Sequence, residues 1–113
     1  MERQELEKLT RDYQMVQEQL QSLAMQKEQF TAQREEHKEA VVELEKAAGK
    51  VYVGVGGAIV ETTRDDALKK LKERHDAIDM RLTLVNRQFD EFSKKEKSLR
   101  EEITAALKAE KGP

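Results

Sequence analysis

Apolar residues in the first 48 positions recur in alternating steps of three and four. They fill nine of the twelve positions 6, 9, 13, 16, 20, 23, 27, 30, 34, 37, 41 and 44. A mean spacing of about 3.5 residues is that of a coiled-coil seam, not of a broad-faced globular helix. Chance composition is the alternative, but the step pattern continues unbroken over the whole segment, which contains no Gly or Pro before Gly49. The pattern therefore predicts a helix over residues 2–48.

The same step pattern returns in the second half of the chain. It runs through positions 68, 71, 75, 78, 82, 85, 89, 92, 96, 99, 103 and 106, where ten of the twelve residues are apolar or small. Thr63 can cap the start of this helix, because Asp66 follows three residues later and negative charge suits the positive end of the helix dipole. The pattern predicts a second helix over residues 64–110.

The two seams are symmetric about residue 56. Position 44 is as far from residue 56 as position 68, and position 6 is as far from it as position 106. A chain that folds back at this point brings each pair to the same level, so the pattern predicts one antiparallel coiled coil within a single chain. Three polar seam residues, Lys27, Arg34 and Glu96, are expected to fix its register at some cost in stability.

The segment between the helices has a different composition. Val51–Val55 and Ala58–Thr63 are rich in β-branched residues, and the Gly56-Gly57 pair between them suits a two-residue turn with positive φ. The pattern predicts a β-hairpin over residues 50–63. A plain glycine loop is the alternative, but a loop has no need of so many Val and Ile residues. Gly54 within the first strand suits either a bulge or the bend of a closed barrel.

An isolated two-stranded hairpin is only marginally stable in water. We expect nothing within the chain to cover its apolar side chains, so other chains should complete the sheet as an intersubunit β-barrel. The residues predicted to carry these contacts are Val51, Val53, Val55, Ile59 and Val60. The predicted fold class is mainly α, a long antiparallel two-helix coiled coil connected by one β-hairpin.

Composition narrows the classes of protein that remain. The 113 residues allow one domain, 1–113, and with 39% charged residues and only five aromatic residues they do not suit a compact globular core. A net charge of -2 disfavours a general nucleic-acid binder, and no apolar stretch is long enough for a membrane span or a secretory signal. We therefore expect a cytoplasmic protein with no nucleic-acid or membrane partner.

No catalytic arrangement is visible, so we expect neither an enzyme nor a bound cofactor. The segment from Gly54 to Gly57 lacks the Lys-Ser/Thr of a phosphate-binding loop. His37 and His75 fall at the same level of the seam, and two imidazoles leave a zinc site incomplete unless Glu36 or Asp76 contributes. Packing of the two rings within the seam is the favoured interpretation, and no metal is predicted.

At the hairpin the sequence resembles a known family. A helix, one β-hairpin and a second helix, with the stretch Val51-Tyr52-Val53-Gly54-Val55-Gly56-Gly57-Ala58-Ile59-Val60-Glu61-Thr62-Thr63, look like a beta-class prefoldin subunit of archaeal type. Val55-Gly56 and Ile59-Val60 are most similar to the hairpin of that family. A single hairpin points to the beta class, because alpha-class subunits carry two.

The resemblance implies a function. Prefoldins are ATP-independent holdase chaperones, in which two alpha and four beta subunits join their hairpins into a double β-barrel platform. The tips of their coiled coils capture unfolded proteins and pass them to a group II chaperonin. In this chain the corresponding client-binding residues are expected near the termini, where helix ends fray: Leu6, Leu9, Tyr13, Val16, Leu99, Ile103 and Leu107.

Two other functions compete with the chaperone. A structural coiled-coil adaptor would use the same hairpin to assemble but would bind no client and would keep its helix ends closed. A helical arm that binds nucleic acid is weaker, because no basic stripe adjoins the heptads. A chaperone and an adaptor should differ in the apolar surface exposed near the termini.

Overall fold

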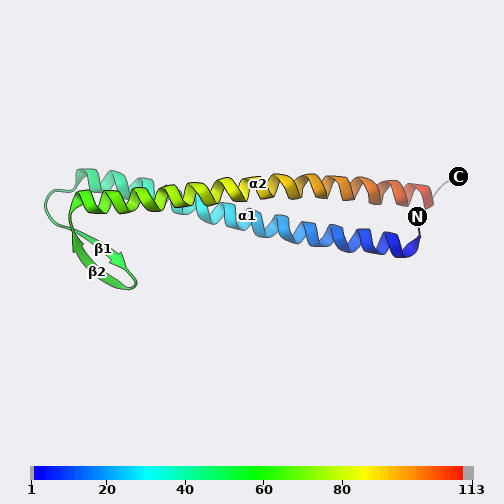
Figure 1. Cartoon of the computed structure of the whole chain (residues 1–113), viewed down its shortest axis with the longest axis horizontal. Coiled ribbons are helices and arrows are strands. Elements are labelled where there is room, and N and C mark those ends of the chain that lie inside the picture. The colour runs from blue at the N-terminus through cyan, green and yellow to red at the C-terminus, as the bar shows by residue number, and fades with distance from the viewer. Residues whose placement is uncertain (1, 111–113) are drawn as a thin grey trace. The chain divides into compact units, whose positions relative to one another are not determined.

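The computed structural model describes residues 2–110 and contains two long helices joined by a β-hairpin (Figure 1). The order of elements is α1 (Arg3–Lys46), β1 (Val51–Val55), β2 (Ala58–Thr62) and α2 (Arg64–Glu110). This arrangement confirms the predicted fold class, while the assembly of the hairpin into a barrel stays a prediction for a single chain. Helix α1 ends two residues before the expected position, and α2 has the expected bounds.

The chain divides into two compact units. One, here called the terminal unit, joins the first part of α1, up to Lys27, to the part of α2 that starts at Leu84. The other, called the hairpin unit, spans Glu28–Thr83 and includes both strands. In the terminal unit the start of α1 and the end of α2 lie side by side (Figure 1).

The predicted seams form the cores of both units. All twelve seam positions of α2 and eleven of the twelve in α1 are buried or half-buried, and only Lys27 is exposed. Val16, Leu23 and Val85 are at most 8% exposed in the terminal unit, as are Ile78 and Leu82 in the hairpin unit. In each unit the core is thus a row of side chains along the seam, which is what a period of 3.5 residues produces.

The two strands form a regular antiparallel pair. Val55 pairs with Ala58 next to the turn, and Val51 pairs with Thr62 at its open end. Gly56 and Gly57 have φ values of 54° and 87°, which a residue with a Cβ atom rarely adopts, so the predicted two-residue turn is confirmed. Gly54 pairs with Ile59 in an unbroken ladder, and the alternative of a bulge there is wrong.

Both helix ends next to the hairpin are capped by side chains. The Thr63 hydroxyl accepts a hydrogen bond from the backbone N–H of Asp66 at 3.2 Å, as the sequence predicted. Arg64 donates from Nη1 to the carbonyl of Glu45 at 3.3 Å, near the end of α1. A cation at this point also favours the negative end of the helix dipole. One residue, Arg64, thus connects the start of α2 to the end of α1.

Candidate functional site

The hairpin presents two faces with different surroundings. Val51, Val53 and Val55 alternate onto the face that also carries Val60, since Val53 and Val60 are paired. The other face carries Tyr52 and Ile59, which are 61% and 79% exposed. Both strands have one outer edge without a partner strand, because the sheet of the described residues contains only these two. The hairpin therefore offers an apolar face and two open edges for intersubunit contact.

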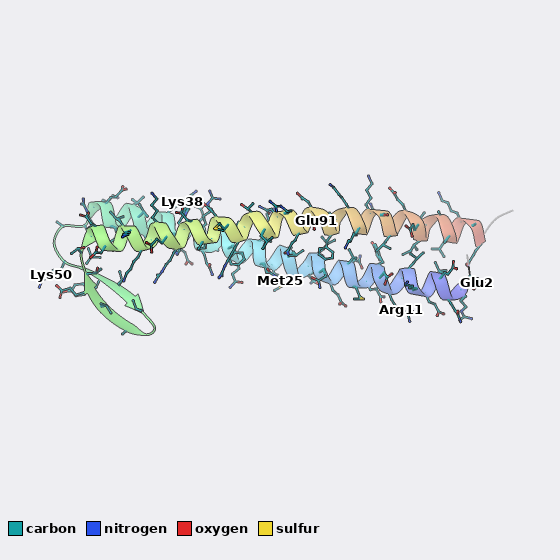
Figure 2. The ribbon with its side chains drawn as sticks, in the orientation of Figure 1. Glu2, Arg11, Met25, Lys38, Lys50 and Glu91 are labelled. Atoms are coloured by element: carbon teal, nitrogen blue, oxygen red, sulfur yellow. The ribbon has the colours of Figure 1, made fainter. Side chains whose placement is uncertain are left out.

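Strand β1 lines a groove together with the helix ends of the hairpin unit. The groove has a volume of about 470 Å³ and an apolar floor that includes Leu44, Val53 and Leu71. Lys70 and Arg74 of α2 lie along it. Lys50, at the base of the hairpin (Figure 2), also lines the groove, and its ammonium pairs with Glu61 at 3.2 Å. The hairpin is thus held against its own helices at its base and is open at its turn.

The five predicted assembly residues do not share one environment. Val51 is only 8% exposed, so the expectation that nothing within the chain covers these residues is wrong for this position. Val53 is half-buried, while Val55, Val60 and Ile59 are 47%, 45% and 79% exposed. Exposure thus increases from the base of the hairpin toward its turn. The role of these residues in assembly stays a prediction.

The terminal unit brings six of the seven predicted client-binding residues together in one seam. Val16 is 8% exposed and only Leu107, at 43%, is exposed. The remaining five, Leu6, Leu9, Tyr13, Leu99 and Ile103, are half-buried. Six of the seven therefore pack between the two helices, and a client would reach them only if the end of the coil opened.

A shallow groove beside this seam was not predicted from the sequence. It has a volume of about 520 Å³, and its apolar lining comes from Met15 and Val16 of α1 and from Phe92 and Leu99 of α2. Met15 lies off the seam and is 64% exposed. The Lys95 ammonium lies 5.0 Å from the centre of the Phe92 ring. In the sequence the only signal was that the apolar residue Met15 precedes the seam residue Val16. Such a pair of neighbouring apolar residues is too common in helices to predict a groove.

Lys27, Arg34 and Glu96, the three polar seam residues expected to fix the register, each contact the facing helix. The Tyr13 hydroxyl donates to Oε1 of Glu96 at 3.0 Å, and Arg34 Nε lies 3.4 Å from Oδ1 of Asp79. The Lys27 ammonium lies 5.9 Å from the centre of the Phe89 ring. These pairs depart by only a few residues from symmetry about residue 56. Their geometry fits the expected role in fixing the register.

The interaction with Glu96 also changes the chemistry of Tyr13. Its pKa is raised above 10.0, mainly because the Glu96 carboxylate accepts its hydrogen bond, with burial and the negative charge of Glu96 acting in the same direction. Arg100, whose Nε is 3.8 Å from the same carboxylate oxygen, acts in the opposite direction. The phenol therefore stays protonated and keeps donating over a wider pH range.

The two histidines lie in the seam of the hairpin unit. His75 Nε2 is 3.2 Å from Oδ2 of Asp79, and His37 Nδ1 is buried without a hydrogen-bond partner. Within residues 2–110 no three His, Cys, Asp or Glu side chains gather as a set of metal ligands. Neither helix, over its described length, contains a segment that is both long and apolar enough to cross a bilayer.

Comparison with known proteins gives a consistent result. The model of a family described as "Prefoldin subunit" matches residues 7–110. The chain is 40% identical to prefoldin subunit beta of Methanosarcina acetivorans over 96 residues, which cover 83% of this chain and 82% of that protein. It is 39% identical to prefoldin subunit beta of Pyrococcus furiosus, covering 81% and 80%. The crystal structure of the prefoldin beta subunit from Thermococcus strain KS-1 superposes with a TM-score of 0.83 at 32% identity, covering 92% of this chain and 93% of that one.

Proposed function

The chain belongs to the beta class of prefoldin subunits, and from this premise we propose that it is an ATP-independent holdase that captures unfolded proteins near its termini and delivers them to a group II chaperonin. Prefoldins are a family of chaperone subunits, and membership implies assembly with other prefoldin subunits. The proposal goes beyond family membership in four respects. It states that unfolded proteins are the clients, that they bind near the termini, that they pass to a group II chaperonin, and that the protein is cytoplasmic.

The proposed assembly contains two alpha-class and four beta-class subunits joined through their hairpins. The exposed apolar residues Ile59, Tyr52 and Val55 support the use of the hairpin as an interface. The open edges of β1 and β2 support sheet extension between subunits, because unpaired backbone groups readily accept a further strand. Several copies of the terminal unit would then act on one client, and linked weak sites gain avidity.

The observation that carries the client proposal is the apolar surface of the terminal unit. The groove beside the seam exposes Met15, whose flexible thioether adapts to side chains of many shapes. Leu107 is also exposed, close to the end of α2. A non-native protein offers apolar side chains without a fixed shape, and burial of these side chains supplies the driving force without a nucleotide.

The structural adaptor is the second candidate, and one observation favours it. Six of the seven residues predicted for client contact are packed in the seam, as in a coil whose end is closed. An adaptor needs no more than this. The chaperone proposal needs the groove around Met15, the opening of the coil end, or both.

The test compares two methionines of similar exposure. Met15 is 64% exposed in the groove, whereas Met25 is 66% exposed on the side of α1 that points away from α2 (Figure 2). Met15→Gln and Met25→Gln are each assembled with an alpha-class partner, and aggregation of an unfolding client is followed by light scattering. We expect Met15→Gln to suppress aggregation less well than the natural sequence, and Met25→Gln to match it.

A truncation provides the second arm of this test. Removal of residues 1–10 and 104–113 should leave an assembled complex that no longer suppresses aggregation. Full suppression by both Met15→Gln and the truncated complex would refute the proposed client surface. If the complex with the natural sequence fails to suppress aggregation of any client, the adaptor is favoured instead.

A further inference from the structure

The seam of the terminal unit contains one carboxylate, and its surroundings are unusual for a coiled-coil core. The Glu96 side chain is only 20% exposed. Oε1 accepts the hydrogen bond from Tyr13 on the facing helix at 3.0 Å, and Nε of Arg100 on the same helix lies 3.8 Å from that oxygen. Placing a carboxylate in a seam that is partly shielded from water costs folding free energy unless such partners remain in place. Tyr13, Glu96 and Arg100 are called the latch below.

The latch divides the seam of the terminal unit into two parts. Toward the hairpin the next seam residue of α1 is Val16, which is buried at 8% exposure. Toward the termini the seam contains Leu6, Leu9, Leu99 and Ile103, which are half-buried, and the small residue Ala106, which is 6% exposed. The described ends of both helices lie beyond these residues, so this part of the seam has the fewest contacts to lose when it opens.

We propose that this latch, through the contact between Tyr13 and Glu96, sets how often the end of the coil opens. It thereby regulates the exposure of apolar residues to a client. This inference rests on the proposed client function of the terminal unit. When the pair separates, Leu6, Leu9 and Ile103 lose their cover together. The groove around Met15 widens in the same movement, because Leu99 lines it and lies one turn from Glu96.

The chemistry of the pair makes its strength adjustable by substitution. Loss of the Tyr13 hydroxyl leaves the half-buried Glu96 carboxylate without its partner on the facing helix, and an acceptor that is partly shielded from water is costly when it loses its hydrogen bond. Replacement of both partners by apolar side chains removes this cost and leaves a continuous apolar seam. A single substitution therefore opens the end, and a double substitution closes it.

The experiment measures opening and function on the same full-length complexes. Hydrogen exchange of residues 2–12 and 97–110 reports opening, and suppression of client aggregation reports function. Tyr13→Phe should speed exchange in these segments by about tenfold and increase suppression at low temperature. Tyr13→Phe/Glu96→Leu should slow exchange below that of the natural sequence and weaken suppression. Ser22→Ala removes an exposed hydroxyl from the same terminal unit, away from the latch and the hairpin, and should leave exchange in these segments unchanged.

The outcomes separate the latch from the client function. Unchanged exchange in Tyr13→Phe, or faster exchange in the double variant, would overturn the latch. Exchange that follows the prediction while suppression stays constant across all variants would also overturn it, because the pair would then be only structural. If no complex, including that of the natural sequence, suppresses aggregation, the proposed client function fails, whatever the exchange rates show.

Discussion

Replacement of Ile59 by Asp should dissociate the complex while the chain itself stays folded. In the single chain Ile59 is 79% exposed, so about four fifths of its side chain remains to be buried by a neighbouring subunit. Full burial of an Ile contributes about 1.5–3 kcal/mol, which makes about 1.2–2.4 kcal/mol for this share. An Asp in the same contact would add an unpaired charge at a cost of about 1–3 kcal/mol.

The two contributions together weaken each contact by about 2–5 kcal/mol, which corresponds to a rise in the dissociation constant of roughly 30-fold to several thousand-fold. Met80 offers a matched control, because it is 75% exposed on α2, away from the hairpin. A surface substitution of this kind usually changes stability by no more than about 0.5 kcal/mol. Met80→Asp should therefore assemble as the natural sequence does.

Sedimentation velocity with an alpha-class partner, over a series of concentrations, distinguishes the two variants. Circular dichroism should show that both retain their helices. Ile59→Asp/Val60→Asp extends the test to both faces of β2, since neighbouring strand residues point to opposite sides. If the double variant still assembles at the concentrations at which the natural sequence does, the hairpin is not the interface. Dissociation of Met80→Asp would show that exposed apolar residues outside the hairpin also matter.

Two further predictions concern the terminal unit. Leu23→Ala, at a seam position that is 5% exposed, should lower the free energy of unfolding by about 2–5 kcal/mol in chemical denaturation, whereas Met25→Ala, at 66% exposure, should change it little. Because the pKa of Tyr13 is raised in the folded chain, its hydrogen bond stabilises the fold below pH 10.0 and is lost as the pH rises through the folded value. Thermal unfolding should thus show a loss of stability in alkali that is smaller in Tyr13→Phe, and an equal loss in both proteins would contradict the assignment.

Much of the fold could be predicted from the sequence because its signals are local. A seam with a period of 3.5 residues requires only that apolar side chains recur on one side of a helix, and the buried positions in both helices follow it, with the exception of Ala67. The turn at Gly56-Gly57 depends on φ values that few residues other than glycine adopt. The cap at Thr63 depends on a hydroxyl that lies three residues before the backbone N–H that it accepts from. Each of these features is decided within a few residues of chain.

The tertiary structure alone decided which side chains meet across the seam and which stay uncovered. The heptads place Tyr13 and Glu96 in the same seam, but only the stagger of the two helices brings the hydroxyl within 3.0 Å of the carboxylate. Val51 looks like its neighbours in the strand, yet the base of the hairpin lies against the helices and covers it. Met15 lies off the seam and becomes part of a groove only because Phe92 and Leu99 stand beside it on the other helix. A repeat in one chain determines the buried face of each helix, whereas contacts between distant residues depend on the relative rotation and stagger of two helices, which no local pattern encodes.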